Sequence, residues 1–75
     1  MNILLFGGAG FVGNNLARKL LSEGHAVTVF DDFSTGRSEN LSDMEGKIRV
    51  VEGDVRDMKA VETITAEVKP DAVYF

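Results

Sequence analysis

Near its start the chain reads Phe6-Gly7-Gly8-Ala9-Gly10-Phe11-Val12-Gly13, directly after the apolar run Ile3-Leu4-Leu5. An apolar strand, a glycine-rich turn and then a helix form an arrangement that presents free backbone N–H groups to a phosphate. Glycine permits the tight turn and lets ligand oxygens approach the backbone closely. Two registers fit, Gly8-x-Gly10-x-x-Gly13 and the wider Gly7-x-x-Gly10-x-x-Gly13. The stretch therefore predicts a phosphate-binding turn, whose ligand must be inferred from the residues that follow.

Beyond this turn, short apolar or β-branched runs alternate with segments whose apolar residues recur at three- and four-residue spacing. The first pattern is typical of strands and the second of amphipathic helices. An apolar strand without alternation is typical of a parallel sheet that is covered on both faces. We expect strands at 2–6, 26–30, 47–52 and 71–75, helices at 11–23 and 58–68, and a short helical turn at 39–44.

This order of elements predicts an α/β fold with a partial, Rossmann-type parallel sheet. The four strands are expected in the order third, second, first, fourth, with helices on both faces and a ligand crevice between the first and fourth strands. The last strand is still apolar at Phe75, with no helix after it. We therefore expect residues 1–75 to be the N-terminal portion of a dinucleotide-binding domain, without its substrate domain.

The composition argues against several functional classes. A net charge of -4 disfavours binding to nucleic acid or to an anionic membrane surface. The absence of Cys excludes disulfides, thiolate metal sites and a Cys nucleophile, and a single His with no second His nearby disfavours a zinc site. No run approaches the roughly 18 to 20 apolar residues that span a bilayer, and no secretory signal is evident. We expect a cytoplasmic protein.

Asp31 follows the second expected strand, near the spacing of about 20 residues at which a carboxylate holds the adenosine ribose of a dinucleotide. A carboxylate there also repels a 2′-phosphate, so NAD is expected rather than NADP. Arg37 favours the opposite choice, but it lies further along the loop. Taken alone, the glycines are equally well explained as a tight connection and Asp31 as a solvated strand end. Their occurrence together, in the order strand, glycines, helix, strand and Asp, favours cofactor binding.

Three segments carry a resemblance to a known family. Gly7 to Gly13 resembles the glycine signature of the extended short-chain dehydrogenases/reductases, in the NAD-dependent sugar epimerase/dehydratase family. Asp31 to Arg37, with Glu39-Asn40-Leu41, resembles the segment after the second strand in the UDP-glucose 4-epimerase branch. Glu52 to Asp57 is similar to the family's stretch beside the adenine. Together they cover most of the chain and favour the wider glycine register.

The resemblance implies which residues contact NAD. The backbone around Gly10, Phe11 and Val12 would face the pyrophosphate, in a turn framed by Gly7 and Gly13. The residues implied at the adenosine end are Asp31, Asp32, Ser34, Thr35, Gly36, Asp54 and Val55.

Within the adenosine set, two carboxylates have implied roles. The Asp31 carboxylate would accept hydrogen bonds from the ribose, and the Asp54 carboxylate would accept a hydrogen bond from the exocyclic amine of adenine. Two positions depart from the family's pattern: Phe6 replaces a usual Thr, and Asp32 replaces a frequent Asn. The ribose end is therefore unusually acidic.

The family's catalytic Tyr-x-x-x-Lys pair lies further along its chains, and Tyr74, the only Tyr here, falls inside an expected strand. We therefore expect no catalytic residue and no metal ligand in this chain, and no turnover by it alone. For a complete enzyme, the resemblance implies epimerisation at C4 of a nucleotide sugar by transient hydride transfer to NAD. Two alternatives stay open: an NAD-binding module without catalysis, and a unit that self-associates through the exposed last strand.

Overall fold

Strand β1 (Asn2–Phe6) lies inside the sheet because it is apolar on both faces and pairs on both sides. Its parallel neighbours are β2 (Ala26–Asp31) and β4 (Ala72–Tyr74). Strand β3 (Arg49–Glu52) pairs in parallel with the outer side of β2. The sheet order is thus β3-β2-β1-β4, which confirms the predicted α/β topology.

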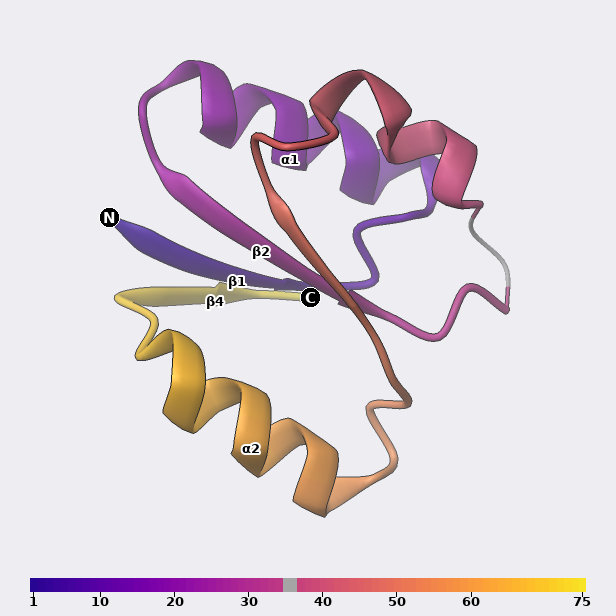
Figure 1. The fold of residues 1–75 in the computed structure, drawn as a ribbon, viewed down its shortest axis with the longest axis vertical. Helices are drawn as coiled ribbons and strands as arrows, with labels where there is room; N and C mark the ends of the chain where they lie inside the picture. Colours follow the sequence, from indigo (N-terminus) through magenta and orange to yellow (C-terminus); the bar gives the residue numbers. More distant parts are fainter. Residues whose placement is uncertain (35–36) are drawn as a thin grey trace.

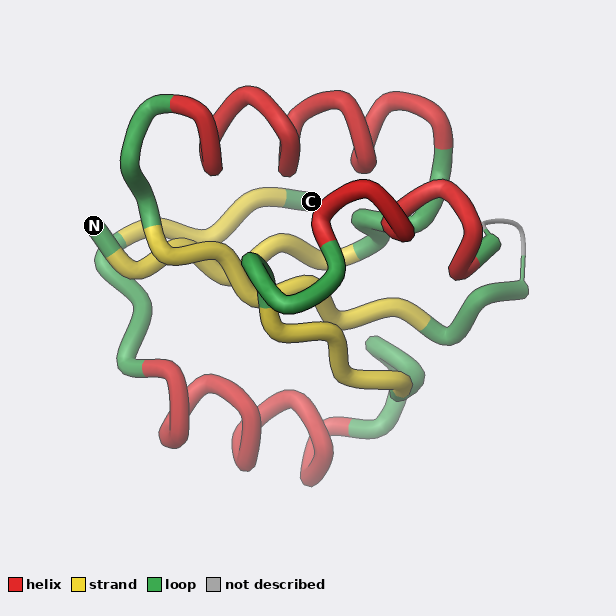
Figure 2. The backbone as a smooth tube through the Cα atoms, turned by 45° about the horizontal axis from the view of Figure 1, so that its top comes forward, coloured by secondary structure: helices red, strands yellow, loops and turns green. Residues whose placement is uncertain are grey.

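The computed structural model describes residues 1–34 and 37–75 and places helices on both faces of this sheet. Helix α1 (Phe11–Ser22) and the 3₁₀ segment η1 (Ser38–Met44) cover one face, and α2 (Met58–Val68) covers the other (Figures 1 and 2). None of the helices in these two ranges is both long enough and apolar enough to cross a membrane.

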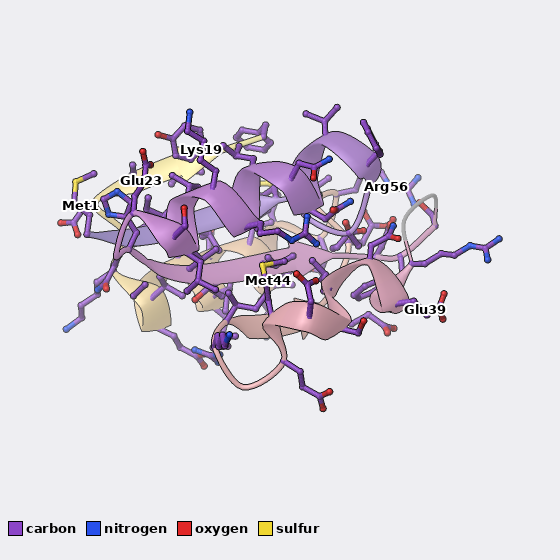
Figure 3. The ribbon with its side chains drawn as sticks, turned by 90° about the horizontal axis from the view of Figure 1, so that it is seen from above. Met1, Lys19, Glu23, Glu39, Met44 and Arg56 are labelled. Atoms are coloured by element: carbon purple, nitrogen blue, oxygen red, sulfur yellow. The ribbon has the colours of Figure 1, made fainter. Side chains whose placement is uncertain are left out.

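The core consists of two apolar clusters, because successive strand residues point to opposite faces of the sheet. Figure 3 shows Met44 between α1 and η1, within the first cluster. On the α1 side the buried residues include Ile3, Leu5, Ala17, Leu20, Val27, Val29, Leu41 and Met44. On the α2 side they are Leu4, Phe6, Phe30 and Ile64.

Phe6, which stands where the family usually has Thr, is accommodated by aromatic packing at the end of β1. Its ring meets Phe30 of β2 edge-on, with centroids 5.4 Å apart. It also stacks on Phe75, at 4.9 Å between centroids and 15° between ring planes. Such pairs add about 0.5–1.5 kcal/mol beyond their buried area. The departure at Phe6 therefore fills the end of the sheet without disturbing the turn that follows.

Most element boundaries lie within two residues of those expected. Asp57 caps α2 as the sequence suggests, with its carboxylate accepting the Ala60 N–H at 3.2 Å. The helix ends at Val68, and its C-cap Lys69, directly before Pro70, has a left-handed φ of 49°. Strand β2 extends one residue further than expected, to Asp31. This extension places the Asp31 carboxylate on the rigid sheet rather than in the loop.

Candidate functional site

The fold requires glycine at three positions of the turn after β1. A Cβ at Gly8 would lie 2.6 Å from Cγ1 of the buried Val29 side chain. Gly7 and Gly13 are required for different reasons. Gly7 has a φ of 81°, which side chains other than glycine rarely adopt, and its N–H donates to the Phe30 carbonyl at 2.9 Å. At Gly13 a Cβ atom would collide with the Gly7 carbonyl oxygen, because α1 passes directly over the turn. These two glycines are therefore explained by the fold.

Gly10 is not explained by the fold. Its φ is -76°, and a Cβ there would meet no atom closer than the Gly7 carbonyl oxygen at 3.9 Å. Gly10 is also the N-cap of α1 and provides no side-chain cap for its first N–H groups. The missing side chain thus leaves open space at a helix N-terminus, the place where backbone N–H groups receive a phosphate.

A cavity of about 180 Å³ lies beside this helix start, between the glycine turn, the end of β2 and the loop before α2. Five predicted cofactor residues line it together with two others: Gly7, Gly10, Asp31, Asp32 and Val55, with Phe30 and Gly53. The sequence analysis did not single out Phe30 and Gly53, although Gly53 falls within the segment that resembles the family's adenine-flanking stretch. A Cβ at Gly53 would collide with the Phe30 ring, so glycine is needed there for packing.

Among the predicted residues that the structure describes, five are absent from this lining: Phe11, Val12, Gly13, Ser34 and Asp54. Phe11 and Val12 begin α1, and their side chains are strongly exposed, at 81% and 77%. Ser34 and Asp54 lie in the loops on either side of the cavity wall. Thr35 and Gly36 fall outside the described residues.

Asp31 joins the turn to the loop that follows β2. Its Oδ2 accepts the Ala9 N–H at 2.9 Å, and its Oδ1 accepts the Phe33 N–H at 2.8 Å. The residue is 8% exposed and still borders the cavity. Because a carboxylate oxygen can accept more than one hydrogen bond, Asp31 retains acceptor capacity toward a ligand hydroxyl. Phe33 adopts a left-handed φ of 58° here, which its hydrogen bond to Asp31 helps to hold.

Asp32 differs from its neighbour because its side chain is exposed. Its Oδ1 accepts the Ser34 N–H at 3.0 Å, and this bond is the main reason that the pKa of Asp32 is lowered. The charge of Arg56 acts in the same direction on this pKa, whereas the charge of Asp54 opposes it. The pKa of Asp32 therefore depends on both of these neighbouring charges.

Asp54 and Arg56 form an ion pair that the sequence analysis missed. The Asp54 carboxylate accepts the Arg56 backbone N–H at 2.8 Å and its Nη2 at 2.7 Å. The side-chain bond from Arg56 is the main cause that lowers the pKa of Asp54 to about 2. The Arg56 side chain is 85% exposed, and Figure 3 shows it at the end of the molecule away from Met1. The spacing of two residues between Asp54 and Arg56 was the only sequence feature that could have indicated this ion pair.

The loop after β2 is held to the turn through Ala9. The Ala9 carbonyl accepts the Asn40 side-chain amide at 2.8 Å and the Arg37 N–H at 3.3 Å. Arg18 of α1 in turn donates to the Asn40 carbonyl at 3.2 Å and makes a two-pronged ion pair with Asp43 at 2.7 and 2.9 Å. Hydrogen bonds thus connect the turn to η1, and η1 to α1.

A larger groove of about 450 Å³ lies between β3 and α2. It borders the other side of Phe30, and the predicted cofactor residues are absent from its lining. The ion pair between Arg49 and Glu67, at 2.6 Å, connects β3 to α2 within this lining. In the part of the chain that the structure describes, no group of His, Cys, Asp or Glu is arranged to hold a metal ion. The cofactor hypothesis therefore rests on the smaller cavity, where the glycine turn and the carboxylates converge.

Comparisons with known proteins agree with this geometry. The model of a family described as the NAD dependent epimerase/dehydratase family matches residues 3–75. A UDP-glucose 4-epimerase of Mycolicibacterium smegmatis is 40% identical over 76 residues, covering 99% of this chain and 24% of the relative. A dTDP-glucose 4,6-dehydratase of Mycobacterium tuberculosis is 43% identical over 70 residues, covering 89% and 21%.

Among solved structures, the UDP-glucose 4-epimerase of Thermus thermophilus in complex with NAD superposes with a TM-score of 0.89. It is 35% identical, and the match covers 99% of this chain and 23% of that one. The chain thus spans about a quarter of the length of the relatives that it matches.

Proposed function

The chain belongs to the NAD-dependent epimerase/dehydratase family, and we propose that its 75 residues bind the adenosine and pyrophosphate half of NAD. The observation that carries this proposal is Gly10, whose missing side chain has no packing reason but opens a cavity at a helix start. The carboxylates of Asp31 and Asp32 border the same cavity. A phosphate receptor and a ribose receptor thus stand side by side.

In this proposal the backbone N–H groups at Gly10, Phe11 and Val12 receive the pyrophosphate, because the first turn of a helix attracts anions. Asp31 accepts the hydroxyls of the adenosine ribose while its backbone partners keep the carboxylate in place. Val55 contributes an apolar wall to the adenine. The predicted contacts from Gly7, Gly13, Asp32, Ser34, Thr35 and Gly36 complete the adenosine and pyrophosphate site.

Asp54 is the predicted hydrogen-bond acceptor for the adenine amine. In this structure the Asp54 carboxylate accepts hydrogen bonds from Arg56 instead. Exposed ion pairs of this kind contribute little to stability because solvent screens them, so the guanidinium can move aside at little cost. We therefore keep Asp54 in the proposed site, with Arg56 as a displaceable partner.

We further propose that the complete enzyme is a nucleotide-sugar epimerase of the UDP-glucose 4-epimerase type. When bound, NAD supplies the acceptor and donor of a hydride at the sugar C4. The residues of this chain bind and orient the cofactor and transfer no proton. The M. smegmatis relative supports the epimerase assignment and the M. tuberculosis relative supports a 4,6-dehydratase. Nucleotide sugar is a partner of the complete enzyme only. The cytoplasmic location stays a prediction.

Calorimetric titration of the chain with NAD tests the cofactor proposal. Gly10→Ala leaves the fold intact, since the added methyl group has space. It weakens NAD binding by at least about tenfold, because close approach to charged phosphate oxygens is lost. Glu62→Ala, on the exposed side of α2, serves as the control and leaves binding unchanged. Absence of NAD binding by the unaltered chain, or equal binding by Gly10→Ala, overturns the proposal.

A second candidate function, self-association, is favoured by β4. In the part of the chain that the structure describes, β4 pairs only with β1, and its other edge has no strand neighbour. Val73, Tyr74 and Phe75 are 45%, 39% and 91% exposed. An unpaired apolar edge of this kind favours pairing with a second copy. Native mass spectrometry tests this: dimers that disappear in Val73→Lys support it, and a monomer at high concentration contradicts it.

A further inference from the structure

Asn14 is a buried polar residue near the start of α1, in a helix position for which asparagine has a low intrinsic preference. Its side-chain NH₂ group donates to the Gly10 carbonyl at 2.6 Å and to the Phe11 carbonyl at 3.0 Å. Its Oδ1 accepts Nη1 of Arg18 at 3.1 Å. Carbonyl oxygens only accept and a guanidinium only donates, so these three partners fix the orientation of the Asn14 amide.

The carbonyls of Gly10 and Phe11 share their peptide units with the N–H groups of Phe11 and Val12. These N–H groups are two of the three donors that we propose for the pyrophosphate. The third donor, the Gly10 N–H, shares its peptide unit with the Ala9 carbonyl, which accepts the Asn40 side-chain amide at 2.8 Å. Three consecutive peptide units therefore accept a side-chain amide at the carbonyl end and carry a proposed phosphate donor at the N–H end.

A hydrogen bond to the carbonyl affects the N–H at the other end of the same peptide unit. It restricts rotation of the peptide plane, and it polarises the unit, because hydrogen bonds in a chain strengthen one another inside a protein. Arg18 supports both effects, since its guanidinium also donates to Oδ1 of Asn15 at 3.0 Å. The Asn15 amide in turn donates to the Phe11 carbonyl at 2.9 Å.

We infer that Asn14 is a positioning residue for the pyrophosphate, because its amide orients and polarises the peptide units that carry the Phe11 and Val12 N–H groups. This role rests on the proposed NAD site and adds a residue behind it. The Asn14 amide is already bonded to two carbonyls and to Arg18. Its effect on the phosphate therefore passes through the backbone.

Three substitutions at position 14 separate hydrogen-bond donation from packing, with calorimetric titration of NAD as the measurement. Asn14→Ala removes the donor and is expected to weaken NAD binding by about three- to tenfold, the range of one net hydrogen bond. Asn14→Ser is nearly as small, but its hydroxyl can donate to the carbonyl four residues earlier, as Thr65 does to Val61 at 2.7 Å. It is expected to recover most of the loss. Asn14→Leu restores the volume without a donor and is expected to bind as weakly as Asn14→Ala.

The carbonyls of the helix start keep a partner in all three variants. The Gly10 carbonyl still accepts the backbone N–H of residue 14, at 2.9 Å in the unaltered chain, and the Phe11 carbonyl still accepts the Asn15 amide. Circular dichroism checks that each variant folds. Any two folded variants distinguish the two roles, because donation ranks Ser above Ala and Leu, whereas packing ranks Leu above Ala and Ser.

A spectroscopic signature and a matched control complete the test. The NMR resonance of the Gly10 carbonyl carbon, recorded without ligand, is expected to move upfield in Asn14→Ala and to return in Asn14→Ser, because a hydrogen bond to a carbonyl deshields its carbon. A role in packing alone does not produce this pattern. Thr65→Val removes a hydroxyl-to-carbonyl hydrogen bond from an exposed position of α2 and is expected to leave NAD binding unchanged.

The outcomes separate the role of Asn14 from the proposed function. If the unaltered chain does not bind NAD, the proposed function fails and the role of Asn14 fails with it. If the unaltered chain binds NAD and Asn14→Ala binds equally well, only the role of Asn14 is overturned. Tighter binding by Asn14→Leu than by Asn14→Ser shows that the side chain acts through its volume. A loss in Thr65→Val as large as that in Asn14→Ala shows a general effect of helix stability. Either of these last two results also overturns the inference.

Discussion

The carboxylate of Asp31 accepts the backbone N–H of Ala9 at 2.9 Å, so the end of β2 holds the turn that follows β1. These residues are 22 positions apart in the chain. This bond joins the carboxylate that we propose binds the ribose to the turn that we propose binds the pyrophosphate. For a ligand that carries both groups, such preorganisation reduces the cost of binding.

Asp31→Asn is expected to destabilise the chain by about 1–3 kcal/mol. An Asn side chain places an NH₂ group against one of two backbone donors, Ala9 or Phe33, and leaves that buried donor unsatisfied. Urea denaturation followed by circular dichroism measures the difference. Asp32→Asn is the control, and equal stability of the two variants contradicts the framework role of Asp31.

Gly13→Ala is expected to lower the free energy of unfolding by about 1–3 kcal/mol, the usual range for overpacking. The added Cβ collides with the Gly7 carbonyl oxygen and separates α1 from the turn. Thermal denaturation of Gly13→Ala and Gly10→Ala makes the comparison, because the same methyl group has space at position 10. A similar loss in both variants would show that the turn tolerates no side chain anywhere.

The ion pair with Arg56 makes a prediction about pH. The pKa of Asp54 is lowered from 3.8 to about 2, so the pair stabilises the folded loop at pH values above about 4. This stabilisation is lost as the pH falls from about 4 toward 2, because protonation then removes the carboxylate charge. Carbon-detected NMR titration of the Asp54 carboxyl measures the pKa. In Arg56→Ala it should return toward 3.8.

Arg18→Ala is expected to loosen η1 from α1. The guanidinium connects Asn14 and Asn15 of its own helix to Asn40 and Asp43. Hydrogen exchange of the amides in segment 41–44 should accelerate in this variant. Lys19→Ala, one residue along the same helix, removes a cation that faces solvent and should leave the exchange unchanged. Unchanged exchange in Arg18→Ala would mean that Leu41 and Met44 alone hold η1 in place.

The purified chain is expected to show no epimerase turnover with a UDP-sugar and NAD. Tyr74 is the only Tyr and lies in β4, paired with β1, rather than at the cavity. A coupled assay for the C4 epimer, with a complete family member as the positive control, makes the measurement. Sustained conversion by the chain alone would contradict the separation of cofactor binding from proton transfer.

The order of the elements and of the strands followed from the sequence because hydrophobic periodicity and the handedness of crossovers restrict the alternatives. Asp57 as the cap of α2 followed from its position alone. The residue type did not distinguish Gly10 from Gly13, since only the path of α1 over the turn shows which glycine the packing requires.

Two features of the site depend on contacts that a linear pattern does not contain. The Asp31 carboxylate accepts both the Ala9 N–H and the Phe33 N–H, which requires the glycine turn to lie beside the end of β2. The Arg56 ion pair is local in sequence, but it depends on a side-chain direction that composition does not specify. For this reason the family resemblance implied an adenine contact for Asp54, but the ion pair of Asp54 with Arg56 was not predicted.

The backbone of Ala9 connects two separate elements to the glycine turn. Its N–H donates to Asp31 at the end of β2, and its carbonyl accepts the side-chain amide of Asn40 in η1. Because one residue makes both contacts, a change that displaces the Ala9 backbone is expected to weaken the hydrogen bond to Asp31 and the hydrogen bond to Asn40 together.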